Sequence, residues 1–333
     1  MSFFAVLFAL IFEQARPLAR GNAIHGGLRA WARWSSRNLD AGRKHHGWLA
    51  WSVAALGPTL ISLAIYLLLW HVHFLLAFVW SVAVLYMTLG FRQFSHHFTQ
   101  IRDALDVGDE AAARELLAQW QQVDASELPR SEIVRHVIEH SVLAAHRHVF
   151  GVFAWFSVLA ALGLGPAGAV LYRMSEFVSR YWAFKGRLAS ENASPALQHA
   201  ANRAWGLIDF LPARLTAIGF AVVGSFEDAI DSWRHYSQGL AGNAGAASAH
   251  GNDGVVLAAT AGAVNVRLGG SALRAAGAMY LPAPEGGEPP ATLATPGREA
   301  ELAHLRSVVG LVWRSVVLWM VLLALLTTAR LLG

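Results

Sequence analysis

Long apolar runs alternate with polar stretches along this chain, and the lengths of the runs predict where it crosses a membrane. A helix needs about 20 predominantly apolar residues to span the hydrocarbon core of a bilayer. The runs predict membrane segments at approximately residues 2–13, 49–70, 74–91, 149–171, 205–224 and 308–332. The first run is short, so we expect either a short or tilted membrane helix or a helix at the membrane surface.

The polar stretches predict helices outside the membrane and one tight turn. In residues 92–148, apolar positions such as Ile101, Leu105 and Leu117 recur at helical spacing, which is typical of amphipathic helices. Only His71 to His73 separate the second and third segments, which predicts a hairpin. The pattern favours an all-α, multi-pass integral membrane protein with amphipathic cytoplasmic helices, built as a single membrane domain over residues 1–333 with a loop and linker at 240–305.

Composition supports the membrane class. The chain of 333 residues is 55% hydrophobic and 14% charged, whereas soluble domains have about 25% charged residues. Its mean hydropathy is +0.40. It has no cysteine, which excludes disulfides and thiolate metal sites. The formal charge of +4 is small and its basic residues form no long run, so nothing indicates a nucleic-acid partner.

Basic residues predict the orientation of the first loop. Residues 14–48 hold seven basic side chains against one acid, Asp40, which places this loop in the cytoplasm by the positive-inside rule. Arg29, Arg33 and Arg37 recur every four residues and would form one stripe on a helix. Such a stripe either holds a phosphate-bearing ligand or rests on anionic lipid headgroups.

The segment at 149–171 contains several helix breakers. Gly163, Gly165, Pro166 and Gly168 indicate a kink, a re-entrant turn or close helix packing. The stretch that follows is basic, although strict alternation would place it outside the cell. The topology of residues 149–224 therefore stays open at this stage.

The 205–224 segment carries charges that are costly in a bilayer. Asp209, Pro212 and Arg214 lie near its start. A charged pair beside a proline at this depth needs protein or water around it, so the segment is a candidate functional site. Alternatively, both charges lie at the membrane–water interface, where they cost little.

One further cluster has the residue types of a metal site. Glu132, His136 and His140 recur every four residues, and Glu139 lies beside His136. Side chains of this kind coordinate divalent metals, but the HExxH spacing is absent. We therefore predict no metal site and interpret the cluster as the polar face of an interfacial helix.

Three motifs resemble one known family. LIDFLPARLTA (residues 207–217), GNDGVVLAATAGAVNVRLGG (251–270) and GAVLYR (168–173) look like motifs of the CobD/CbiB family. The first resembles that family's Asn-Trp-Leu-Pro-Ala-Arg-Leu-Thr, and the third its Tyr-Arg before an Asn-Thr-Leu-Asp motif. Together with the N-terminal hairpin, the similarity covers most of the chain.

The resemblance implies a multi-pass membrane enzyme of cobalamin synthesis. Family members join adenosylcobyric acid to an aminopropanol or its phosphate through an amide bond, with ATP and Mg²⁺. This sequence departs from the family at its acidic motifs. AHRHVFG (145–151) stands where the family has Ala-Glu-Asn-Thr-Val-Asp-Gly, and Glu176 to Ser179 replace Asn-Thr-Leu-Asp. Carboxylates hold Mg²⁺ on phosphates, so their loss bears directly on activity.

The synthase hypothesis assigns roles to particular residues. Arg214 would hold a phosphate or carboxylate with two hydrogen bonds. The remaining candidates fall into two groups: the catalytic acids Glu139, Glu176 and Asp209, and the ligand-binding residues His146, Arg147, His148, Asn252, Asn265 and Arg267. His146, Arg147 and His148 replace the acidic motif and favour an anionic ligand over a metal ion. Mg²⁺ and ATP are expected cofactors only if this hypothesis holds.

A second resemblance keeps another function open. The opening FFAVLFALIFEQ and the stretch from Leu207 to Trp233 also look like AmpE-type inner-membrane proteins, which are tied to β-lactamase induction. That similarity implies a non-catalytic sensor or regulator. Under either hypothesis we expect a protein of the bacterial cytoplasmic membrane whose partners are membrane lipid and a corrinoid or other anionic small molecule, with a homo-oligomer also open.

Overall fold

The computed structural model describes residues 2–16, 23–121, 124–187, 193–242, 251–270 and 294–332. In these ranges the chain is helical and has no strand; one isolated β-bridge joins Val266 and Arg298. The predicted all-α class is confirmed. The helices are α1 (Ser2–Ala15), α2 (Ala23–Leu39), α3 (Lys44–Val72), α4 (Phe74–Thr88), α5 (Phe91–Asp106), α6 (Glu110–Gln121), α7 (Arg130–Ala145), the π-helical turn η1 (His146–Phe150), α8 (Gly151–Ala161), α9 (Ala167–Arg187), α10 (Pro195–Ile208), α11 (Phe210–Val223), α12 (Phe226–Gly242), α13 (Gly251–Val264) and α14 (Leu302–Leu332).

Among the described residues, three helical stretches are long and apolar enough to cross a membrane. They are α3, the continuous stretch Arg130–Ala161 formed by α7, η1 and α8, and Leu302–Ala329 of α14. A fourth span results if α10 and α11, which bend at Asp209, are counted as one. The shorter helices α1 and α4 are also apolar. These lengths and compositions are those of a multi-pass membrane protein.

The chain divides into two compact units, and each is described by itself. Unit 1 comprises Met1–Phe91, Arg147–Pro212 and Trp319–Gly333. Unit 2 comprises Arg92–His146 and Ala213–Leu318. The predicted loop and linker at 240–305 lies partly outside the described residues, which here cover 240–242, 251–270 and 294–305.

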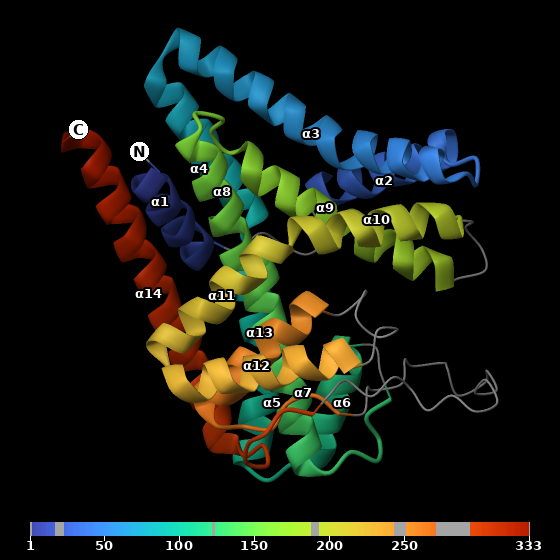
Figure 1. The fold of residues 1–333 in the computed structure, drawn as a ribbon, viewed down its shortest axis with the longest axis vertical. Coiled ribbons are helices and arrows are strands. Elements are labelled where there is room, and N and C mark those ends of the chain that lie inside the picture. The colour runs from blue at the N-terminus through green and yellow to red at the C-terminus, as the bar shows by residue number, and fades with distance from the viewer. Residues whose placement is uncertain are drawn as a thin grey trace. The chain divides into compact units, whose positions relative to one another are not determined.

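The core of unit 1 forms where α3, α9 and α10 pack together (Figure 1). Trp51, Val178 and Leu197 come from the three helices and are buried against one another. Small residues of α3, such as Ala50 and Ala54, let the neighbouring helices approach closely. The Trp182 indole N–H donates to the Ala32 carbonyl on α2 over 3.3 Å, which ties α2 to α9.

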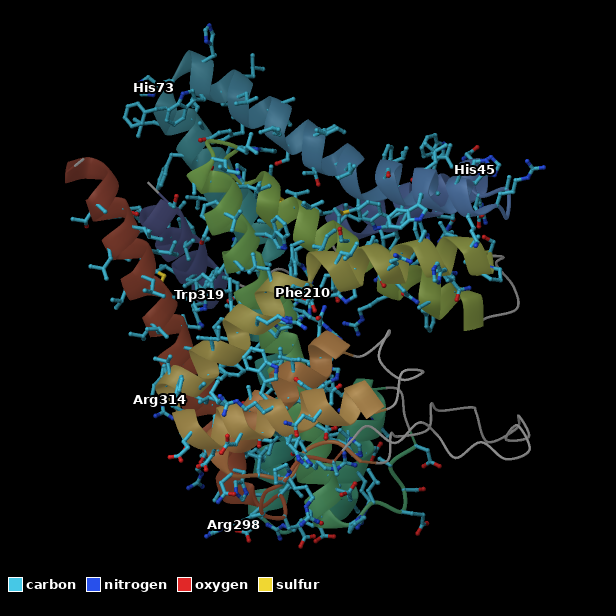
Figure 2. All side chains as sticks on the ribbon, viewed as in Figure 1. His45, His73, Phe210, Arg298, Arg314 and Trp319 are labelled. Atoms are coloured by element: carbon cyan, nitrogen blue, oxygen red, sulfur yellow. The ribbon has the colours of Figure 1, made fainter. Side chains whose placement is uncertain are left out.

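The predicted hairpin between α3 and α4 is confirmed. The α3 helix ends at Val72, His73 is extended, and α4 begins at Phe74. The Nδ1 atom of His73 accepts from the Leu75 N–H over 3.2 Å, which caps the first turn of α4. Figure 2 shows His73 at this turn.

The predicted membrane helix at 149–171 does not form as one element. The helix ends at Ala161, and α9 begins at Ala167 after a short turn. Gly163 and Gly165 adopt φ values of 81° and 55°, which disfavour other residues, and they end the helix. The helix instead extends toward the N-terminus to Arg130, through the stretch predicted to be polar.

In unit 2, α12 and α13 pack against each other along their length. A Cβ atom on Gly262 of α13 would lie 2.1 Å from the Asp228 carbonyl oxygen of α12. Glycine is therefore required where the two backbones meet. The α6 helix begins at Asp109, whose carboxylate accepts from the Ala112 N–H over 2.9 Å, a standard N-cap.

Candidate functional site

A buried carboxylate on α9 organises the charged residues of unit 1. The side chain of Glu176 is only 5% exposed. Its Oε2 accepts from Arg173 Nη1 over 2.9 Å, and its Oε1 accepts from Arg180 Nη1 over 3.0 Å. The three residues are three and four positions apart, so a single helix brings them together. Both carboxylate oxygens are therefore already bonded to guanidinium groups.

The charges around Glu176 keep it ionised. Burial alone would raise its pKa, but Arg173 and Arg180, with smaller contributions from His148 and Arg147, lower the pKa to about 2. The predicted residues Arg147 and His148 thus belong to the same neighbourhood as Glu176.

A second buried pair joins α9 to the end of α10. The Tyr172 hydroxyl donates to Asp209 Oδ1 over 2.7 Å, and both residues are fully buried. Burial and the charge of Asp209 raise the pKa of Tyr172 well above its usual value, so the phenol stays protonated as a donor. Asp209 lies at the bend where α10 ends. Next to it, the Trp155 indole N–H donates to the Ile208 carbonyl over 2.8 Å.

Replacing Tyr172 by phenylalanine is expected to lower the free energy of unfolding by about 1–3 kcal/mol, because Asp209 loses a buried donor. Tyr181→Phe on the same helix is the matched control, since the Tyr181 hydroxyl has no hydrogen-bond partner among the described residues. Thermal unfolding in detergent would compare the two variants. Equal melting temperatures would show that the Tyr172–Asp209 bond contributes nothing to stability.

In unit 2, Arg214 of α11 meets the first turn of α13. Its Nη1 donates to the Asn252 Oδ1. The first turn of a helix presents N–H groups that can bind an anion, while Asp253 in this turn adds an acidic side chain beside Arg214. His146 contacts the same helix as Arg214, α11, where its Nδ1 is 2.9 Å from the hydroxyl of the buried Thr216, two residues after Arg214. The three residues His146, Arg147 and His148 are therefore divided between the two units.

Glu139 holds α7 to the end of the Gly251–Gly270 motif. Its Oε1 accepts from the Gly269 N–H over 2.7 Å and from Arg135 Nη1 over 2.9 Å. Arg135 in turn donates to the Gly269 carbonyl. These bonds give Glu139 a structural role in unit 2. Glu176 and Asp209, the other predicted acids, both lie in unit 1.

The two remaining motif residues act through their backbones. Asn265 has φ of 52° and turns the chain at the end of α13, and its side chain is exposed. The Arg267 N–H donates to the Arg298 carbonyl over 2.7 Å, while its side chain is exposed. Among the described residues of unit 2, neither the Asn265 side chain nor the Arg267 side chain forms a hydrogen bond with Arg214 or Asn252.

The carboxylates that pair with arginine do not fit the Mg²⁺ ion that the family resemblance implies. Mg²⁺ requires hard oxygen ligands from one or two carboxylates. Both oxygens of Glu176 pair with arginines, and Arg135 pairs with Glu132 as well as with Glu139. No group of three or more His, Asp or Glu residues converges among the residues searched. The predicted polar face of α7 is thus an ion-pair network.

Sequence reasoning underestimated the arginines. Arg173 enters the sequence prediction only as the last residue of the GAVLYR motif, and Arg180 and Arg135 are not among the predicted site residues. The signal was present in the spacing, because each arginine lies three or four positions from a carboxylate along a helix. Such spacing is common on solvated helices, and only burial distinguishes these pairs.

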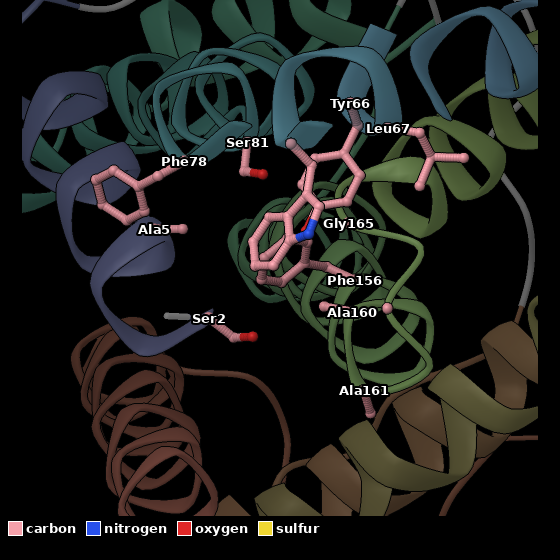
Figure 3. Close-up of a pocket in the computed structure, with 12 residues that line it drawn as sticks. Ser2, Ala5, Tyr66, Leu67, Phe78, Ser81, Phe156, Ala160, Ala161 and Gly165 are labelled. Atoms are coloured by element: carbon pink, nitrogen blue, oxygen red, sulfur yellow. The ribbon is translucent and has the colours of Figure 1, made fainter. Parts of the chain in front are cut away.

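Two pockets lie within unit 1. The larger, of about 460 Å³, is lined by residues of α1, α3, α4 and α8 and of the turn before α9, and none of its described lining residues is charged. Figure 3 shows Tyr66, Phe78 and Phe156 around it. The second pocket, of about 360 Å³, lies among α2, α3, α4 and α9 and contains Arg173. Only the second pocket reaches the charged cluster.

Comparisons with known proteins agree with the motifs. The chain is 29% identical to "Cobalamin biosynthesis protein CobD" of Stutzerimonas stutzeri (strain A1501) over 290 residues, 86% of this chain and 84% of that relative. It is 32% identical over 198 residues to the protein of the same name from Chromobacterium violaceum, which covers 60% of this chain and 58% of that relative. A Leptospira interrogans protein of that name is 26% identical over 211 residues, or 60% and 59% of the two chains.

No solved structure matches the chain. The family described as "CobD/Cbib protein" matches residues 2–328, nearly the whole sequence. This protein belongs to the CobD/Cbib family.

Proposed function

We propose that this protein acts in cobalamin biosynthesis in the bacterial cytoplasmic membrane, where it binds adenosylcobyric acid and joins it to aminopropanol or its phosphate through an amide bond. The observation that carries the proposal is that residues of the three family-like motifs pair with one another. Tyr172 of the third motif bonds Asp209 of the first, and Arg214 of the first bonds Asn252 of the second.

The chemistry of the described residues supports binding of an anion. Guanidinium groups recognise carboxylates and phosphates with paired hydrogen bonds. A corrinoid carboxyl group that is to become an amide is an anion before it reacts, and so is an aminopropanol phosphate. Arg214, with the first turn of α13 beside it, offers such a ligand several donors.

Activation of the corrinoid carboxyl group by ATP is a chemical step separate from binding. Glu176 and Glu139 already pair with arginines, so we assign neither of them to Mg²⁺ or to ATP chemistry. The decisive experiment is calorimetry on purified protein in detergent with an adenosylated corrinoid and, separately, with Mg-ATP. Binding of both, followed by amide formation with aminopropanol phosphate, supports the full proposal.

Other outcomes divide the alternatives. Corrinoid binding without ATP binding would overturn the synthase activity and leave a corrinoid-binding protein. Binding of neither would overturn the proposal and favour the AmpE-type sensor, for which cell-wall fragments would be tested next. Neighbouring genes offer an independent test, since corrinoid-synthesis genes favour the first function and peptidoglycan-amidase genes the second.

Arg214→Ala is expected to weaken corrinoid binding by at least tenfold, the effect of losing about 1.4 kcal/mol or more from a charged hydrogen bond. Arg298→Ala is the matched control, because Arg298 is exposed and contributes its backbone to the bridge with Val266. Calorimetry on both variants measures the difference. Unchanged affinity in Arg214→Ala would show that the motif serves helix packing alone.

A further inference from the structure

The second pocket of unit 1 combines an apolar lining with very few polar groups. Its lining comes from α2, α3, α4 and α9, and Ile61, Val84 and Phe177 are typical of it. Arg173 is the charged residue among the described lining residues. The volume of about 360 Å³ lies within the range of about 300–1,000 Å³ that ligand pockets occupy.

Two donors at this pocket lack partners. Ser62 of α3 is 5% exposed, and its hydroxyl has no hydrogen-bond partner among the described residues. The indole N–H of Trp31 on α2 is likewise buried and without a partner there. A buried donor without a partner can hydrogen-bond to a ligand that enters the pocket. Both residues line the same pocket.

Arg173 retains hydrogen-bonding capacity beyond its ion pair. Its Nη1 donates to Glu176, and the structure gives no other hydrogen bond for this side chain among the described residues. Its side chain is 21% exposed. A guanidinium group has five N–H donors, so Nε and Nη2 are available to an anionic oxygen. Charge complementarity thus favours an occupant with one negative group and a long apolar body.

The elements around the pocket indicate where the occupant comes from. The α3 helix is long and apolar enough to span a membrane, and α4 is a shorter apolar helix that packs on it. The α2 helix turns Leu28 and Trp31 toward this core while Arg29 and Trp34 are exposed. Basic and aromatic residues on one face of an amphipathic helix are typical of membrane interfaces.

We propose that this pocket binds one anionic diacyl phospholipid, with an acyl chain among Ile61, Val84 and Phe177 and the phosphate on Arg173. An apolar pocket among membrane helices is open to lipid, and the single cation selects a negatively charged headgroup. A water-soluble anion would gain nothing from the apolar lining. The proposal does not rest on corrinoid binding, and its test does not involve a corrinoid.

The test is native mass spectrometry on the full-length protein after delipidation in detergent. Phosphatidylglycerol and phosphatidylcholine with identical acyl chains are added at equal concentrations. Both lipids carry a phosphate, but phosphatidylcholine also carries a cationic choline group, which the guanidinium group of Arg173 repels. We expect one phosphatidylglycerol per chain to be retained at least about fivefold more strongly than phosphatidylcholine. Equal retention of the two lipids would overturn the proposal.

Variants locate the binding. Ile65→Trp fills the pocket from α3 and should reduce phosphatidylglycerol retention to the level of phosphatidylcholine. Leu68→Trp, one turn further along α3, is the control because Leu68 is 65% exposed and is not among the lining residues. Equal retention in these two variants would place the lipid elsewhere and contradict the site.

Two further arms complete the experiment. Arg173→Gln should remove the preference for phosphatidylglycerol while leaving weak retention of both lipids. If Ile65→Trp does not fold, Thr88→Phe fills the same pocket from α4 and replaces it. Displacement of the lipid by glycerol phosphate at equal concentration would show that the headgroup alone binds, which would overturn the role of the acyl chain.

Discussion

Replacing Glu176 by glutamine is expected to lower the free energy of unfolding by about 3 kcal/mol at neutral pH. The pKa of Glu176 falls from 4.5 to about 2 in the folded protein, and each unit corresponds to about 1.4 kcal/mol. Glutamine keeps the shape of the side chain but removes the charge that Arg173 and Arg180 neutralise. Arg180 is 56% exposed, so solvent screens part of its contribution.

The same variant should change the acid dependence of stability. Because the folded-state pKa of Glu176 is depressed, its stabilisation is fully present above about pH 4.5 and is lost as the pH falls toward 2. The difference between the wild-type protein and Glu176→Gln should therefore shrink across this range. Denaturant unfolding in detergent at neutral and acidic pH would measure it.

Glu115→Gln provides the matched control for the charge change. Glu115 is exposed on α6 and accepts a hydrogen bond from Gln119 across one helical turn. Its replacement should change stability by less than about 0.5 kcal/mol. If Glu176→Gln behaves like this control at every pH, the ion pairs around Glu176 are not a source of stability.

Much of the fold follows from the sequence, because membrane helices are encoded locally. The run of apolar residues that forms α3 and the short turn at His73 need no long-range information. The break before α9 could also be anticipated from Gly163, Gly165 and Pro166. The effect of this break could not be anticipated, because the same residues are compatible with a kink inside one helix and with the observed separation of α8 and α9 into two helices.

The extension of the membrane-length helix to Arg130 has a physical reason that hydropathy misses. Residues 131–148 carry many polar side chains, and each of them lowers the mean hydropathy whether or not it is buried in the fold. In the structure Arg135 and His136 are about 95% buried, because Glu132 and Glu139 pair with Arg135 on the same helix. Ion pairing thus allows a polar sequence to continue an apolar helix.

The pairings of the candidate site residues could not be predicted from the sequence. Asp209 and Arg214 attracted attention as charges in an apolar segment, and both are bonded in the structure. Their partners Tyr172 and Asn252 lie 37 and 38 residues away. Contacts over such separations depend on how helices pack, and the spacing of residues along a single sequence does not specify that packing.

Gly262→Ala is expected to destabilise unit 2 by about 3 kcal/mol, the upper end of the range for overpacked cores. The added Cβ would lie 2.1 Å from the Asp228 carbonyl oxygen, 2.4 Å from its carbonyl carbon and 2.6 Å from the Ala229 Cα. All three atoms belong to the backbone of α12, so no side-chain rotation can relieve the contact. The two helices have to separate.

Gly219→Ala on α11 is the matched control, because a Cβ there would meet nothing within 4 Å. Alanine has the higher helix propensity, so this variant should be neutral or slightly more stable, by up to about 1 kcal/mol. Thermal unfolding of both variants in detergent would show the contrast. Equal stability of the two variants would mean that α12 and α13 are not held at the distance seen here.

The glycine also links packing to the proposed ligand site. Asn252 lies at the start of the helix that Gly262 lets approach α12, and Arg214 bonds to Asn252. A displacement of α13 should therefore weaken corrinoid binding in Gly262→Ala, measured below its melting temperature, while Gly219→Ala binds as the wild-type protein does. If Gly262→Ala is destabilised but binds the corrinoid with full affinity, then the packing of α12 on α13 does not affect binding. The anion site would then lie away from the first turn of α13.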